Sequence, residues 1–157
     1  MPSMHRSVRS GRPPGPDAAP APGTFPGAVG TGYGSPMPAR TLVIKVTAGK
    51  DDPERSGQAL NVAATALASG VAVSLWLTGE AAWFALPGRA AEVVLDHSPP
   101  FGDLLAGVLA AGTVTLCTQC AARRGITEAD LIDGVRIAGA ATFVAEVTGD
   151  HAQALVY

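Results

Sequence analysis

The sequence predicts an α/β domain built on a mostly parallel sheet, with helices on both faces. Short runs of β-branched and apolar residues alternate along the chain with segments of helical character. Glycines and prolines separate these segments and mark where helices begin and end. Alternating strands and helices are typical of parallel sheets, because a parallel connection needs a crossover long enough to hold a helix.

The first half of the domain contains two predicted strands with one long helix between them. Asp52 is placed to cap this helix, Pro53 suits its first position, and Gly70 ends it. The strands are recognised by their β-branched and apolar composition. The strands are expected at residues 41–47 and 71–77, and the helix at about residues 53–69.

The second half continues the alternation with shorter elements. Pro87 and Gly88 stop one short helix, Gly112 closes a second and Gly125 breaks a third. Further strands are expected at residues 92–95, 113–116, 135–137 and 153–156, and helical segments at residues 80–86, 101–111, 118–124, 127–132 and 139–147.

Lys45 interrupts the apolar pattern of the first strand. A lysine in a strand can place its charge in water from an edge of the sheet, or it can meet a partner chain. We interpret Lys45 as a solvated lysine on an edge strand.

The first 38 residues differ in composition from the rest of the chain. They hold nine of the 13 prolines and seven of the 19 glycines, and their large apolar residues are scattered singly. Such a segment buries too little apolar surface to offset the entropy of ordering it. We therefore expect a disordered tail at residues 1–38 and a folded domain at residues 39–157.

The charge balance argues against several classes of partner. The net charge is −2, and 47% of the residues are hydrophobic. No basic excess suggests nucleic acid or an anionic membrane. No apolar run approaches the roughly 18 residues of a transmembrane helix. The arginines near the N-terminus are not followed by the apolar stretch of a secretory signal. We therefore expect a cytoplasmic protein.

The two cysteines of the chain, Cys117 and Cys120, form a CxxC pair directly after a predicted strand. In a sheet of this kind, ligands bind beyond the carboxyl ends of the strands. That rule places the pair on the same edge as the loops that contain Gly49 and Glu80. Gly49-Lys50 lacks the GxxxxGK[ST] spacing of a phosphate loop, so nucleotide binding is not predicted.

Four interpretations of the cysteine pair are open at this point. Structural zinc needs about four ligands, and the chain offers no second paired motif. A thioredoxin-like disulfide would normally follow an early strand. A reactive thiol is favoured at Cys117, because it precedes a helix start and because Arg123 and Arg124 add positive charge nearby. Both cysteines could also be small buried residues.

The segment CTQCAARRGI, residues 117–126, resembles the cysteine segment of the DsrE/DsrF-like sulfur-relay family, which includes TusD-type sulfurtransferase subunits. A second, weaker match runs from Asp52-Pro53-Glu54-Arg55 to the glycine that ends the first helix. The resemblance covers about residues 40–157. It implies a flavodoxin-like three-layer α/β fold, assembly into trimers or hexamers, and an active cysteine at position 117. Cys120 and the Pro/Gly-rich tail depart from the TusD pattern.

The function hypothesis that follows is a cytoplasmic sulfur-relay protein that holds sulfane sulfur on Cys117 as a persulfide. Cys120 would assist Cys117 or resolve its oxidised or persulfidated form. The candidate binding positions are Arg123, Arg124, Glu80 and Gly49. Its partners would be a sulfur donor and a sulfur acceptor protein, and no cofactor or metal is expected. The alternatives are a non-catalytic oligomeric binding module and a thiol redox sensor that uses both cysteines.

Overall fold

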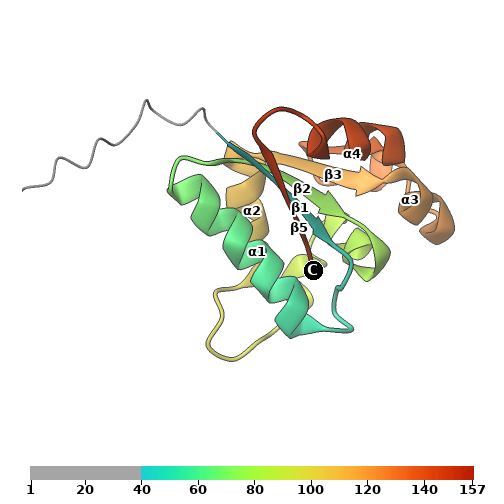
Figure 1. Cartoon of the computed structure of the whole chain (residues 1–157). Coiled ribbons are helices and arrows are strands. Elements are labelled where there is room, and N and C mark those ends of the chain that lie inside the picture. Colours follow the sequence, from blue (N-terminus) through green and yellow to red (C-terminus); the bar gives the residue numbers. More distant parts are fainter. Residues whose placement is uncertain (1–39) are drawn as a thin grey trace, which may run out of the picture. The chain divides into compact units, whose positions relative to one another are not determined.

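A computed structural model describes residues 40–157, so the predicted tail at residues 1–38 lies outside the described residues. Its centre is a sheet of five parallel strands in the order β4-β3-β2-β1-β5 (Figure 1). The predicted α/β class with a parallel sheet is confirmed. The strands are β1 (Thr41–Val46), β2 (Ala72–Leu77), β3 (Thr113–Cys117), β4 (Val135–Ala138) and β5 (Ala152–Val156).

Helices lie on both faces of this sheet, which gives the three layers of a flavodoxin-like fold (Figure 1). Helices α1 and α2 pack against each other and cover one face, whereas α4 lies over the other. The bounds are α1 (Pro53–Ala68), α2 (Phe101–Ala111), α3 (Thr118–Arg124) and α4 (Ala140–Val147), with short 3-10 helices η1 (Gly79–Ala85), η2 (Ala90–Glu92) and η3 (Glu128–Asp130).

The start of α1 follows the predicted capping. The carboxylate of Asp52 accepts a hydrogen bond from the backbone N–H of Arg55 at 3.2 Å, and Pro53 occupies the first turn. Gly70 adopts a positive φ of 78° just beyond the end of the helix, a conformation that glycine tolerates without strain. The helix therefore begins and ends where local chemistry directs it.

The main core lies between the sheet and the pair α1 and α2. Alternate strand residues such as Ile44, Leu75 and Leu116 are fully buried there, in one core cluster with Leu60 of α1. Because side chains alternate across a strand, their neighbours in sequence point to the opposite face. That face holds Lys45, Ser74, Trp76, Thr115 and Arg136, and is therefore more polar.

Two sequence-based expectations are wrong. Residues 92–95 form no strand: Val93 turns into the core while Val94 is 85% exposed, after the short helix η2. Lys45 does not lie on an edge strand, because β5 pairs along the outer side of β1. The final strand of the chain thereby makes β1 an internal strand, and Lys45 is half-buried.

Candidate functional site

A cavity of about 150 Å³ lies at the carboxyl ends of the central strands. Cys117 is the last residue of β3, Thr78 directly follows β2, and Gly139 directly follows β4. The strand-end rule thus places the thiol where sequence reasoning expects it. The lining residues are Lys45, Trp76, Thr78, Cys117, Gln119, Gly139, Ala140 and Phe143.

Cys117 is half-buried and forms the N-cap of α3. Burial raises the pKa of its thiol, but the other influences are together stronger, so the pKa lies below its ordinary value. These are the backbone N–H and thiol of Cys120, the backbone N–H of Gln119 and the ammonium of Lys45, all of which favour the thiolate. These contacts favour the thiolate form, which is the reactive form of a cysteine, at Cys117.

Cys120 has the opposite environment. Its side chain is buried, with 7% exposed, one turn into α3. Burial raises the pKa of the Cys120 thiol, and the neighbouring Cys117 adds to this increase, while the backbone N–H of Gly79 opposes it. That N–H donates to the Cys120 sulfur across 3.2 Å. The two thiols thus differ in both access and acidity.

Arg124 does not face the Cys117 cavity. Its side chain donates to the backbone carbonyl of Cys120 at 3.3 Å and to the carboxylate of Glu80 at 2.6 Å. Its guanidinium also lies 5.8 Å from the ring centre of Trp83. Arg124 therefore fastens α3 to η1, whereas Arg123 is exposed on the outer side of α3.

Gly49 is buried and has a packing role in this structure. A Cβ at this position would lie 2.6 Å from the backbone oxygen of Glu80, closer than atoms can approach. Its carbonyl accepts a hydrogen bond from the buried Ser56 hydroxyl at 2.9 Å. Only glycine allows the loops after β1 and β2 to meet so closely, and neither Gly49 nor Glu80 lines the thiol cavity.

Sequence reasoning interpreted Lys45 as a solvated edge lysine and did not count it among the site residues, but Lys45 lines the cavity together with Trp76 and Phe143. The signal was present, since a lysine inside an apolar strand needs a partner or water. The structure gives it the ring of Phe143, whose centre lies 5.1 Å from the ammonium. Trp76 meets the same ring edge to face, with centres 5.2 Å apart.

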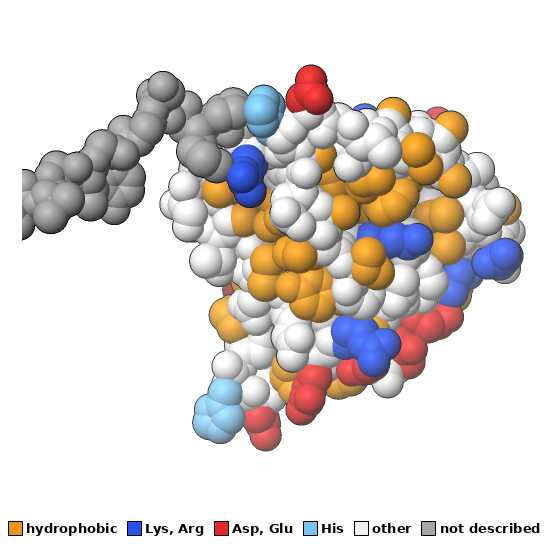
Figure 2. Space-filling model, viewed as in Figure 1, with side chains coloured by type: hydrophobic (Ala, Val, Ile, Leu, Met, Phe, Trp, Pro, Cys, Tyr) orange, Lys and Arg blue, Asp and Glu red, His pale blue; other side chains and the backbone are white. Residues whose placement is uncertain are grey.

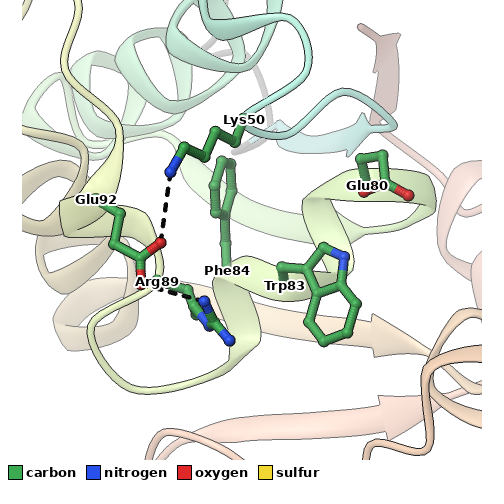
Figure 3. Close-up of a pocket in the computed structure, with 6 residues that line it drawn as sticks. All are labelled: Lys50, Glu80, Trp83, Phe84, Arg89 and Glu92. Atoms are coloured by element: carbon green, nitrogen blue, oxygen red, sulfur yellow. Dashed lines mark hydrogen bonds and ion pairs between the residues drawn. The ribbon is translucent and has the colours of Figure 1, made fainter.

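A larger cavity, of about 350 Å³, lies beside Trp83 and Phe84 (Figure 3). Its basic side chains are already paired: Lys50 lies 3.7 Å from Glu92, and Arg89 lies 3.2 Å from the same carboxylate. This cavity holds no thiol, so we place the candidate chemistry at Cys117.

Two further properties concern the described residues alone. Within residues 40–157, no cluster of three or more histidine, cysteine or acidic side chains has the arrangement of a metal site. None of the helices in this part of the chain combines the length and the apolar character needed to cross a bilayer.

Known proteins resemble this chain in sequence and in structure. It is 33% identical over 104 residues to the uncharacterized protein MJ0760 of Methanocaldococcus jannaschii; the match covers 66% of this chain and 38% of that relative. The ychN protein of E. coli matches with a TM-score of 0.60 and 22% identity, covering 75% of this chain and 98% of that one. MTH1491 of Methanobacterium thermoautotrophicum matches with a TM-score of 0.53 and 11% identity, covering 75% of this chain and 99% of that one.

The two structural matches show that the fold is shared. The sequence family model described as DsrE/DsrF-like matches residues 41–151, which include every strand except the last and both cysteines. This span is well over half of the chain. The protein therefore belongs to the DsrE/DsrF-like family.

Proposed function

We propose that this protein is a sulfur carrier that holds sulfane sulfur on Cys117 as a persulfide and passes it to a partner protein. The observation that carries the proposal is the difference between the two thiols. Cys117 lines a cavity and has a lowered pKa, whereas Cys120 is buried and has a raised pKa. Membership of the DsrE/DsrF-like family indicates a role in sulfur relay in general.

The loading step needs no oxidant or reductant. The Cys117 thiolate attacks the sulfane sulfur of a donor persulfide, forming a new S–S bond. The S–S bond of the donor breaks, and its electron pair leaves with the donor sulfur as a thiolate. Delivery to an acceptor thiolate is the same exchange in reverse, with Cys117 as the leaving thiolate.

The neighbouring residues have supporting parts in this proposal. Cys120 could attack a persulfide on Cys117 and release its outer sulfur as hydrosulfide, leaving a disulfide between the two cysteines. Arg124 and Glu80 hold α3 against η1, and Gly49 lets the Glu80 loop approach. The exposed Arg123 is available to an acidic surface of a donor or acceptor.

We further propose that the chain forms a homo-oligomer, a trimer or a hexamer, in the reducing cytoplasm, where thiols stay free. Hydrophobic side chains gather on the molecular face over β5 and α4 (Figure 2). Val144 of α4 is 54% exposed and Val156 of β5 is 66% exposed. Apolar surface of this kind is commonly covered by another chain.

Incubation of the reduced, desalted protein with a sulfane-sulfur donor, followed by intact mass and site mapping, tests the proposal. We expect the wild type to gain one sulfur atom on Cys117, the Cys117→Ser variant to gain none, and the Cys120→Ser variant to retain loading. Loading that survives the Cys117→Ser change would contradict the proposal. Circular dichroism on each variant checks that the fold is kept.

A thiol redox pair is the second candidate, because the Cys120 thiol lies within hydrogen-bonding reach of Cys117. Such a pair would lose two hydrogen atoms under mild oxidation instead of gaining sulfur. Either single serine variant would abolish that loss, whereas only Cys117→Ser would abolish sulfur loading. The two variants thus separate the two functions.

A further inference from the structure

Lys45 occupies an unusual place for a charged side chain. It pairs with Trp76 on one side and Val156 on the other, inside a parallel sheet. It is half-buried, lines the cavity of Cys117, and its ammonium lies over the ring of Phe143. Partial burial of a lysine costs free energy unless an anion or a polarisable group compensates it.

The carboxylate on this face of the sheet does not supply that compensation. Glu146 of α4 accepts from Arg136 at 2.5 Å with one oxygen, and from Ser74 at 2.7 Å and Trp76 at 2.8 Å with the other. Within residues 40–157, Lys45 forms no ion pair. Its positive charge is therefore available to whatever enters the cavity.

We propose that Lys45 binds anionic sulfane sulfur in the Cys117 cavity and so makes the site selective for negatively charged reactants. This inference rests on the proposed sulfur-carrier function and adds the residue that recognises the cargo. The ammonium compensates the charge of the entering sulfur and of the persulfide that forms.

The chemistry explains why a cation is needed at this point. A thiolate and an anionic donor repel each other, so their encounter is slow unless a positive charge lies between or beside them. In the reaction with an inorganic polysulfide dianion, the Cys117 sulfur forms a bond to a sulfane sulfur. The adjacent S–S bond breaks, and its electron pair leaves with the shortened polysulfide dianion. The total charge is the same before and after, and no external electron acceptor is needed.

The size of the cavity is consistent with a small cargo. At about 150 Å³ it compares with an engineered protein cavity that holds benzene. A short inorganic polysulfide fits such a space whole, whereas the persulfide of a larger thiol would insert only its terminal sulfur atoms. Both donors present an anionic sulfane sulfur, which is the shared chemistry that Lys45 recognises.

The first test uses alkylating reagents and needs no sulfur donor. The rates of Cys117 modification by iodoacetate, an anion, and by iodoacetamide, which is neutral, are measured by site mapping at one pH. Their ratio cancels the fraction of thiolate, so it reports the charge of the cavity and not the pKa of the thiol. We expect Lys45→Met to lower this ratio roughly three- to tenfold and Lys45→Arg to preserve most of it.

The matched control is Lys50→Met, which removes a lysine that faces the other cavity. It should leave the ratio unchanged, and circular dichroism checks the fold of all three variants. An unchanged ratio in a folded Lys45→Met protein overturns the proposal. This measurement involves no sulfur transfer, so it tests the role of Lys45 separately from the carrier function. An unchanged ratio with normal sulfur loading contradicts only the role of Lys45, and a changed ratio without sulfur loading contradicts only the carrier function.

A second arm identifies the source of the sulfur by comparing loading from sodium tetrasulfide with loading from glutathione persulfide. Slower loading of Lys45→Met from tetrasulfide alone supports an inorganic source, and slower loading from glutathione persulfide alone supports a thiol-bound source. Each loading rate is divided by the iodoacetamide rate of the same variant, because loss of Lys45 also raises the pKa of the Cys117 thiol. A lower normalised rate from both donors supports recognition of the shared anion. Loading from both donors at the wild-type rate contradicts the proposal.

Discussion

Arg124 and Glu80 connect two elements that are far apart in sequence, the cysteine-bearing helix α3 and the 3-10 helix η1. Their side chains meet at 2.6 Å, and Arg124 also donates to the carbonyl of Cys120. Only 14% of the Arg124 side chain is exposed, compared with 49% for Glu80. The guanidinium is thus the more enclosed partner, and it holds the helix that follows Cys117.

Arg124→Ala should lower the free energy of unfolding by about 1–2 kcal/mol, because two hydrogen bonds and the packing on Trp83 are lost. The charge interaction itself contributes little, since Glu80 stays in water. Urea denaturation measures the change. Arg123→Ala, on the exposed side of the same helix, is the control and should stay within about 0.5 kcal/mol of the wild type. Equal losses in both variants would contradict the role given to Arg124.

The thiols of the two cysteines should have different pKa values, with that of Cys117 lower than that of Cys120. Iodoacetamide labelling of the wild type across pH, mapped by mass spectrometry, should give Cys117 a midpoint below the roughly 8.5 of a free thiol, and Cys120 one above it. The thiolate is the reactive form, so labelling of Cys117 falls away only as pH drops through its lowered pKa. A denatured sample should bring both midpoints to the free value. Coincident midpoints in the folded protein would remove the basis for assigning the carrier role to Cys117.

Gly79 combines a left-handed backbone conformation with a close contact. Its φ is 50°, and an added Cβ would lie 2.5 Å from the carbonyl oxygen of Thr47. Gly79→Ala should therefore cost roughly 3 kcal/mol or more of stability, from strain and overlap together.

Gly88 offers a matched control, because its φ is 77° and an added Cβ would meet no heavy atom within 4 Å. Gly88→Ala should cost only about 1–2 kcal/mol, which is the backbone strain alone. Thermal or urea unfolding of both variants measures the two losses of stability, and their difference reports the overlap of the added Cβ at position 79 with the Thr47 carbonyl. A Gly79→Ala protein as stable as Gly88→Ala would show that the loops after β1 and β2 are less closely packed than described.

The exposed valine of α4 tests the proposed assembly. Val144→Glu places a charge in the apolar surface over α4 and β5, so it should weaken self-association and lower the mass seen by analytical ultracentrifugation. Val94→Glu is the control, because Val94 is 85% exposed and lies elsewhere, after η2. A wild-type protein that sediments as a monomer, or a Val144→Glu protein that assembles normally, would argue against this surface as the interface.

Much of this fold is predictable from sequence because its signals are local. The Asp52 cap, the glycines after the helices and the β-branched runs act within a few residues, and the structure places helices and strands at those positions. The position of Cys117 is predictable as well, since the end of a strand in a parallel sheet is a general binding position.

The position of Lys45 inside the sheet could not be predicted from local signals. Whether a strand lies at an edge depends on which other strands pair with it, and β5 comes from more than 100 residues further along the chain. The same pairing and the placement of α4 bring Phe143 over Lys45. The strand predicted at residues 92–95 is wrong for a related reason: a short apolar run does not show whether it pairs with a strand, and here Val93 packs into the core after η2 while residues 93–95 pair with no strand.

The attachment of α4 has a consequence for motion at the thiol. This helix has no fully buried residue, and it is joined to the sheet through Glu146 and through the ring of Phe143, which packs on Trp76. Burial raises the pKa of Glu146, but bonds from Trp76, Ser74 and Arg136 outweigh it and leave the pKa lowered. The stabilisation is therefore complete above the ordinary carboxyl pKa and is lost as pH falls through the lowered one.

We therefore expect one wall of the Cys117 cavity, with Ala140 and Phe143, to open locally at lower free energy than the main core. Native-state hydrogen exchange should show α4 amides exchanging well before those of α1, and Glu146→Gln should widen that gap. Equal protection of the two helices would contradict this. An opening of this wall would admit a protein thiol that is too large for the closed cavity, so the proposed persulfide on Cys117 would be shielded from water when the wall is closed and accessible to an acceptor when it is open.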